Sequence, residues 1–216
     1  QPLPAVRADA RPRPNVPGTS NIPPTIRGRR LCLMPVTGAW QGNDMPCYAL
    51  GDLVPRVDPT AFVHPDAVLI GDVRIGPESS VWPTAVLRGD GAPIIVGART
   101  SVQDGTVIHC TQTLSTVIGD RCVVGHNAHL EGCTIHDDSL VGSGSVVLHR
   151  AQVGPNALVG AGALVGNGKV VPPFARALGV PATITPDVVS AGEFTAMADG
   201  YVARTVRYRA ELRRLD

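Results

Sequence analysis

The hydrophobic pattern of the chain has a period of six residues over its central part. Most successive aliphatic positions from Val57 to Val171 are six residues apart, and a small residue often follows four positions later. A helix has a period of about 3.6 residues and a half-buried strand a period of about two, so neither explains the pattern. A short strand with an inward aliphatic residue, a tight turn and an inward small residue does explain it. Such units stack into a parallel β-solenoid, with three units in each triangular coil. The aliphatic series is Val57, Val63, Leu69, Ile75, Val81, Leu87, Val96, Val102, Ile108, Ile118, Val124, Leu130, Ile135, Val141, Val147, Val153, Val159, Val165 and Val171.

The period also predicts which residues stack on one another. Residues one coil apart are eighteen positions apart, at the spacing of about 4.8 Å between paired strands. Two interruptions lengthen single coils by three and four residues, so Arg88 stacks on His109 and His109 on Glu131. Each of these residues directly follows an inward aliphatic residue, which predicts one outward-facing column. The same count places Asp104 under His126 on another part of the coil.

These residues lie in motifs that resemble a known family. The segments VLRGD (86–90), VQDGTVIHC (102–110) and VVGHNAHLEGCTI (123–135) are similar to the γ-class carbonic anhydrase family of hexapeptide-repeat proteins. The similarity runs from about Met45 to the C-terminus and includes GVPA at 179–182. It implies a left-handed parallel β-helix, a homotrimer, and a zinc site, or one for iron or cobalt, at each subunit interface. It also implies reversible hydration of carbon dioxide to bicarbonate.

The resemblance implies a set of metal ligands with one departure. His109 matches a ligand from one subunit and His126 a ligand from its neighbour, whereas Glu131 stands where the family has a third histidine. Two histidines and a glutamate form an accepted zinc environment. A carboxylate lowers the net charge of the site, so bound water would be less acidic and activity weaker. His129, two residues before Glu131, is an alternative third ligand, but it falls at a corner of the repeat, and we expect it to point elsewhere.

Four further residues match functional positions of the family. Arg88 and Asp90 resemble its interface ion pair, and Asp104 resembles a partner of the arginine. Gln103 resembles the residue that hydrogen-bonds the metal-bound hydroxide. A charge network that stabilises the trimer is the alternative for Arg88, Asp90 and Asp104, and a hydrogen bond at a corner is the alternative for Gln103.

The remaining histidines and the end of the chain have simpler interpretations. We expect His64 and His136 to be solvated. His149 should lie at the surface one coil beyond Glu131, and the alternative is that it supports the metal ligands. Thr185 can cap a C-terminal helix, with Pro186 in its first turn. That helix, over 185–216, should pack along the solenoid through a stripe of apolar residues and close the open end of the stack. The stripe comprises Phe194, Met197, Tyr201, Val202, Tyr208 and Leu212.

The chain is thus expected to have three parts. A Pro/Arg-rich extension over 1–44 has no sustained apolar period and is expected to be disordered. The β-helix domain spans 45–184, and the helix follows. The net charge of +1 gives no indication of a basic surface that binds nucleic acid. No stretch approaches the ~20 apolar residues of a membrane span. Five cysteines without a CxxC pair favour a reducing compartment, and we expect a cytoplasmic protein.

Three classes of function fit the sequence. The first is a zinc-dependent hydro-lyase acting on carbon dioxide, although Gly91 and Gln112 stand where the best-studied members carry acidic proton-relay residues. The second is an acyltransferase or thioesterase that uses a histidine as general base. The third is a non-catalytic trimeric binding or assembly subunit.

Overall fold

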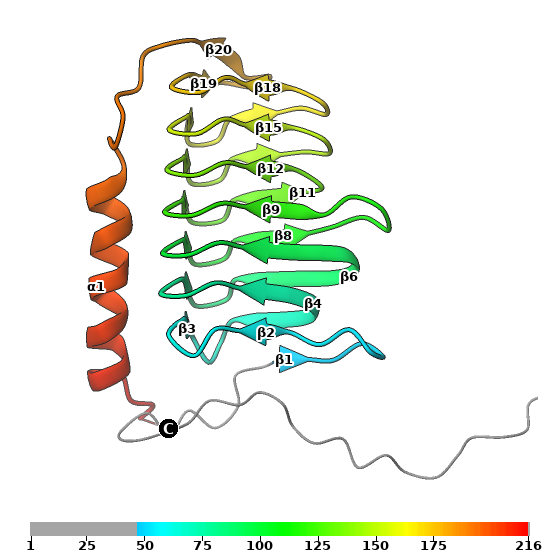
Figure 1. Cartoon of the computed structure of the whole chain (residues 1–216), viewed down its shortest axis with the longest axis vertical. Helices are drawn as coiled ribbons and strands as arrows, with labels where there is room; N and C mark the ends of the chain where they lie inside the picture. The colour runs from blue at the N-terminus through cyan, green and yellow to red at the C-terminus, as the bar shows by residue number, and fades with distance from the viewer. Residues whose placement is uncertain (1–46, 216) are drawn as a thin grey trace, which may run out of the picture. The chain divides into compact units, whose positions relative to one another are not determined.

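The computed structural model describes residues 47–215. The chain winds into a left-handed parallel β-helix with three walls, and one helix runs along it (Figure 1). This confirms the fold predicted from the six-residue period. The extension over 1–44 lies outside the described residues.

The strands are short because each wall of a coil holds one hexapeptide. Wall A contains β1 (Cys47–Tyr48), the first half of β4 (Val68–Ile75) and of β6 (Val86–Val96), β8 (Val107–His109), β11 (His129–Glu131), β14 (Val146–Val147) and β17 (Leu164–Val165). Wall B contains β2 (Arg56–Val57), the second halves of β4 and β6, β9 (Thr116–Ile118), β12 (Thr134–Ile135), β15 (Gln152–Val153) and β18 (Val170–Val171). Wall C contains β3 (Phe62–Val63), β5 (Ser80–Val81), β7 (Ser101–Val102), β10 (Val123–Val124), β13 (Leu140–Val141), β16 (Leu158–Val159), β19 (Arg176–Leu178) and β20 (Thr183–Thr185). Because β4 and β6 continue around a corner, walls A and B form one hydrogen-bonded sheet.

The core is the stack of inward aliphatic residues. Leu69, Leu87, Ile108 and Leu130 lie above one another on wall A and have no exposed surface. Tight turns join the walls, and many place a non-glycine residue at a φ near +55°, such as Asn127. The corner residues therefore adopt the left-handed conformation that closes each turn in few residues.

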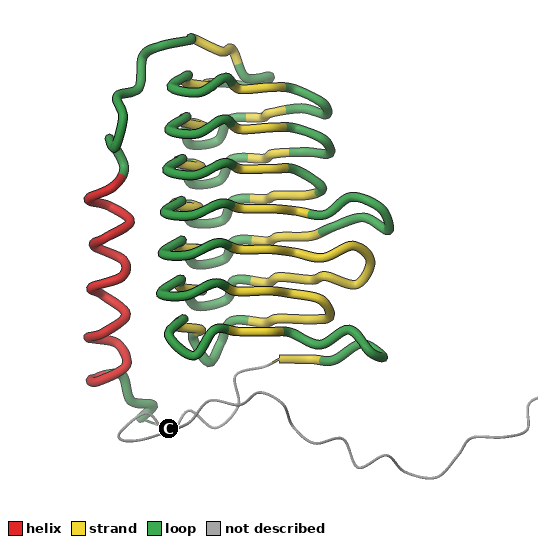
Figure 2. Tube along the Cα trace, in the orientation of Figure 1, coloured by secondary structure: helices red, strands yellow, loops and turns green. Residues whose placement is uncertain are grey.

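The two interruptions of the period emerge at the same corner, between walls A and B (Figure 2). On either side of the first one, Gly71 pairs with Gly89 and Val73 pairs with Ile94. The second lies between β8 and β9. Both insertions project outward, so the stacking of the walls continues past them (Figure 2).

The helix α1 spans Thr195–Glu211 and covers the outer face of wall C. The rings of Tyr201 and Tyr208 pack on Trp82, and Tyr208 also packs on Phe62. Trp82 Nε1 donates hydrogen bonds to the hydroxyls of the wall residues next to it, Ser80 at 2.9 Å and Ser101 at 3.0 Å. The packing of the stripe along the solenoid is confirmed for Tyr201 and Tyr208, whereas Met197 is 45% exposed.

The expected start and capping role of this helix are wrong. Thr185 belongs to β20, which pairs antiparallel with β19, and Asp187 has a φ of 53°. A residue in the left-handed region cannot continue a helix, so α1 begins ten residues later. β20 also covers the strand edge at the end of the stack, a role that the sequence assigned to the helix.

Candidate functional site

The predicted column forms on the outer face of wall A. Arg88 pairs in register with His109, and His109 pairs with Glu131. His109 ends β8 and Glu131 ends β11, so both side chains stand at the edge of wall A next to the insertions. The buried Thr116 hydroxyl donates to the His109 carbonyl at 2.5 Å and accepts from the Gly132 N–H at 2.8 Å, which ties these strand ends together.

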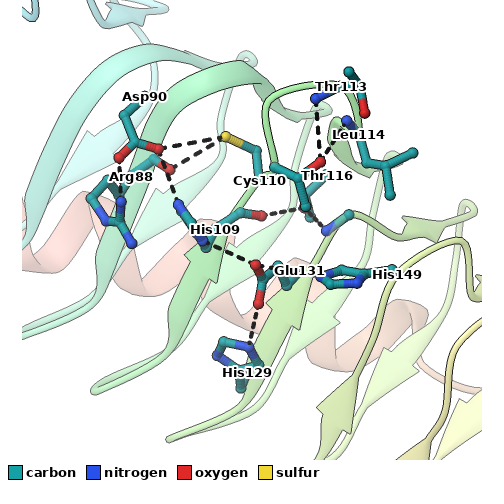
Figure 3. Close-up of polar contacts among 12 residues, drawn as sticks. Arg88, Asp90, His109, Cys110, Thr113, Leu114, Thr116, His129, Glu131 and His149 are labelled. Atoms are coloured by element: carbon teal, nitrogen blue, oxygen red, sulfur yellow. Dashed lines mark hydrogen bonds and ion pairs between the residues drawn. The ribbon is translucent and has the colours of Figure 1, made fainter. Parts of the chain in front are cut away.

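His109 is held between two carboxylates. Its Nε2 lies 3.0 Å from Asp90 Oδ1, and its Nδ1 lies 3.2 Å from Glu131 Oε1 (Figure 3). Asp90 in turn forms an ion pair with Arg88 through its other oxygen. Only about a fifth of the His109 side chain is exposed. A carboxylate on each nitrogen fixes the orientation of the imidazole.

Two further histidines, His129 and His149, approach Glu131, although the sequence favoured positions away from the site for both. His129 Nε2 lies 3.4 Å from Glu131 Oε2, so the expectation that His129 points elsewhere is wrong. β11 includes His129 as well as Glu131, and residues two apart on a strand share a face. His149 Nε2 lies 3.4 Å from Glu131 Oε1, from the turn after β14. The i, i+2 spacing was the signal that could have identified His129.

The carboxylates of the site keep their charge. Partial burial works to raise the pKa of Glu131, but the nearby His149, His109 and His129 outweigh it and hold this pKa below its usual range. Burial likewise opposes ionisation of Asp90, whereas His109 and Arg88 lower its pKa. The site thus presents two carboxylates among imidazoles, which suits a cation.

A second cluster lies at the opposite edge of wall A. His126 is in the turn that leads from β10 to β11, and its Nδ1 lies 2.9 Å from Asp104 Oδ2, as the coil count predicts. About half of each side chain is exposed. Gln103, next to Asp104, is buried. The chain does not bring His126 to His109, because the whole of β11 separates the turn holding His126 from Glu131.

Several donors near His109 could hold a metal. Asp90, His109 and Cys110 each place a ligand atom within 4.8 Å of the other two. For a tetrahedral zinc with bonds of about 2.0–2.1 Å, ligand atoms lie roughly 3.3 Å apart. The distance of 3.2 Å between His109 Nδ1 and Glu131 Oε1 matches that separation. This distance is equally that of a hydrogen bond, so the donors around His109 suit a divalent cation without specifying zinc.

The two histidines that were expected to be solvated differ in their exposure to solvent. His136 is exposed as expected. His64 is not, since only 12% of its side chain is exposed and its ring packs against Phe62. Burial lowers the pKa of His64, and the carboxylates of Asp66 and Asp104 only partly oppose the shift.

Comparison with known proteins gives the family. The family model for bacterial transferase hexapeptides (six repeats) matches residues 115–149 and 132–167. A solved hexapeptide transferase family protein from Anaplasma phagocytophilum is 36% identical, with a TM-score of 0.71 over 76% of this chain and 98% of that one. The Escherichia coli K12 carnitine operon protein CaiE is 45% identical over 114 residues. The mitochondrial γ-carbonic anhydrase 2 of Arabidopsis thaliana is 45% identical over 113 residues. The chain belongs to the hexapeptide transferase family, and part of it is similar to a γ-carbonic anhydrase.

These relatives differ in the share of their length that aligns with this chain. The aligned region spans 58% of the length of CaiE and 41% of that of the plant enzyme. A Bacillus cereus structure whose description proposes acetyltransferase activity is 34% identical, with a TM-score of 0.73 over 96% of its chain. The chain is thus similar to a protein described as a carbonic anhydrase and to others described as transferases. Within residues 47–215, no helix is long and apolar enough to cross a membrane.

Proposed function

We propose that the chain forms a homotrimer that binds zinc between subunits and reversibly hydrates carbon dioxide there. One observation carries the proposal: His109 and Glu131 stand side by side, 3.2 Å apart, at two positions that match metal ligands of the γ-class family. The ligand chemistry is that of other zinc enzymes with two histidines and one glutamate.

A second copy of the chain completes the ligand set. His109 and Glu131 stand at one edge of wall A, whereas His126 stands at the other. In a ring of three copies, His126 of one copy can face His109 of the next. A bound zinc would supply a Lewis acid that makes a water molecule acidic enough to attack carbon dioxide near neutral pH.

The outer face of wall A supports this assembly. Beside the polar column runs a second column of outward residues that contains Val107, 40% exposed, and four half-buried apolar residues. His129 lies between Val107 and Val146 in this column and interrupts the apolar strip once. Apolar residues next to charged groups are typical of a surface that binds another protein chain. The strip comprises Val68, Val86, Val107, Val146 and Leu164.

Residues around the ligands would position them. An Nε2–H donated by His109 to Asp90 leaves the Nδ1 lone pair facing Glu131, where the cation would lie. Arg88 holds Asp90 through the ion pair. Asp104 would orient His126 in the same manner, through a contact at Nδ1. Gln103 would donate a hydrogen bond to the water that reacts.

Metal content and hydration rate of three variants test the proposal. His109→Ala and His126→Ala should each lower the carbon dioxide hydration rate at least 100-fold, because each removes one ligand. His136→Ala is the matched control, since this histidine is exposed and distant from both clusters. A wild-type trimer that holds zinc without turnover would support a binding or assembly subunit instead. Full activity of His126→Ala would contradict the interfacial site.

Acyl transfer is the second candidate. Its supporting observation is the resemblance to the Bacillus cereus structure described as an acetyltransferase, and His109, oriented at Nε2 by Asp90, would act as the general base. Titration of the protein with acetyl coenzyme A separates the two functions. Micromolar binding that His109→Ala leaves intact, together with acetyl transfer that this variant loses, would favour the transferase.

A further inference from the structure

The side chain of Thr116 lies between the two strand ends that carry His109 and Glu131. Thr116 is the first residue of β9, after the second insertion, and it has no exposed surface. Its hydroxyl donates to the carbonyl of His109 and accepts from the N–H of Gly132, which follows Glu131 (Figure 3). One buried oxygen thus contacts both strand ends, each time beside a candidate ligand.

This hydroxyl stands where a parallel sheet has a direct hydrogen bond between backbones. His109 pairs in register with Glu131, so in a continuous ladder the Gly132 N–H would donate directly to the His109 carbonyl. The Thr116 hydroxyl lies between these two groups and bonds to each, at 2.5 Å from the carbonyl oxygen and 2.8 Å from the nitrogen. The separation of the strand ends is therefore set by a side chain.

A second threonine makes the same connection away from the site. Thr100, only 1% exposed, lies in the turn between β6 and β7, at the corner between walls B and C. Its hydroxyl donates to the Gly119 carbonyl at 2.7 Å and accepts from the Cys122 N–H at 3.0 Å. A buried hydroxyl is thus a general way of joining neighbouring coils in this fold, and the one at Thr116 is placed beside the candidate ligands.

We propose that Thr116 is a positioning residue for the pair of ligands His109 and Glu131. This inference deepens the proposed function and rests on it for the identity of the two ligands. By spacing the strand ends, the hydroxyl holds His109 Nδ1 and Glu131 Oε1 3.2 Å apart before a cation binds. Ligands that are held in place beforehand need little rearrangement, which raises the affinity for the cation.

Thr116→Val tests the proposal, because valine keeps the shape of threonine and lacks the hydroxyl. Without the bridge the two ligands lose their fixed spacing, so the zinc affinity of the full chain, measured by titration calorimetry, should fall at least about tenfold. The visible absorption of bound Co²⁺, which reports the geometry of its ligands, should change as well. Thr116→Ser retains the hydroxyl and should restore both the affinity and the spectrum.

Thr100→Val is the matched control, since it removes the same two kinds of hydrogen bond from a buried threonine at another corner. Both valine variants should lower the melting temperature, because each leaves a buried carbonyl and a buried N–H without a partner. Zinc affinity and the Co²⁺ spectrum should stay unchanged in Thr100→Val. A loss of affinity confined to Thr116→Val therefore distinguishes positioning of the ligands from general destabilisation.

A measurement without metal separates this proposal from the proposed function. Crystal structures of the metal-free proteins should show a longer separation of His109 Nδ1 and Glu131 Oε1 in Thr116→Val than in the wild type. The separation in Thr100→Val should equal that of the wild type. If the wild type binds no zinc, the interfacial enzyme is contradicted, whereas these structures still decide the role of Thr116.

Two outcomes would overturn the proposal. One is an unchanged separation of the two ligand atoms in Thr116→Val, and the other is an equal loss of zinc affinity in both valine variants. Thermal melting followed by circular dichroism establishes that each variant is folded. If a valine variant does not fold, Thr116→Ala and Thr100→Ala provide the same comparison with the same expected results.

Discussion

Walls A and C have the same interior but different outer faces. Both bury one aliphatic residue per coil, yet wall C carries Trp82, only 4% exposed, under the helix of its own chain. Wall A carries the column of Arg88, His109 and Glu131 beside Val107, and no helix of the described residues covers it. The repeat therefore fixes the coil, while the outward residues determine whether a wall binds its own helix or another chain.

The free energy of unfolding should be most sensitive to truncation of a side chain on wall C, which α1 covers. Trp82→Ala should lower the free energy of unfolding by about 3–5 kcal/mol, because it leaves a cavity between wall C and α1 and removes the contacts of Tyr201 and Tyr208. Urea denaturation measures the change. Tyr48→Ala is the control, since Tyr48 is 54% exposed, and it should change stability by no more than about 0.5 kcal/mol. Equal effects of the two variants would mean that the helix contributes little.

The open wall should matter for assembly instead. Val107→Asp places a charge in the apolar strip, so the trimer should dissociate with a Kd raised at least ~100-fold, about 2.7 kcal/mol. Light scattering and ultracentrifugation measure the mass. The matched control is Val170→Asp on wall B, where Val170 is 54% exposed. If Val170→Asp dissociates the trimer and Val107→Asp does not, the interface is on wall B.

Metal binding by the column of Arg88, His109 and Glu131 should change when position 131 carries the histidine that the γ-class family has there. Glu131→His gives three imidazole ligands, so zinc affinity should rise about tenfold, about 1.4 kcal/mol, and hydration should become faster at neutral pH. Zinc content and initial rates measure both effects. Strong wild-type activity that this substitution abolishes would show that Glu131 has a catalytic role of its own.

The smallest effect concerns His64 on wall C. Its folded-state pKa is depressed by burial, so the unfolded chain binds the proton more tightly. Stability is therefore fully present above the unfolded pKa of about 6.5 and decreases as the pH falls through the folded pKa. His64→Gln should flatten the dependence of the melting temperature on pH below about 6.5. A wild-type curve that rises as the pH falls below 6.5 would contradict the assigned burial.

The sequence predicted what the repeat alone determines. Counting coils with their insertions placed Arg88, His109 and Glu131 in one column, because parallel stacking leaves no other register. The prediction from the sequence failed where side-chain contacts do not follow the six-residue repeat. His129 was assigned to a corner because a six-residue unit does not show whether a strand extends by one residue. The start of α1 was misplaced because it depends on the pairing of β20 with β19 and on the turn at Asp187.

The insertions at the corner between walls A and B have a consequence for engineering. Pairing resumes in register after each one, with Ile94 next to Thr116 and Val96 next to Ile118. Chain length can thus vary at this corner while the stack beneath stays unchanged. A peptide grafted between β8 and β9 would stand directly beside the His109 and Glu131 side chains, so this corner is where new substrate selectivity can be introduced without redesigning the scaffold.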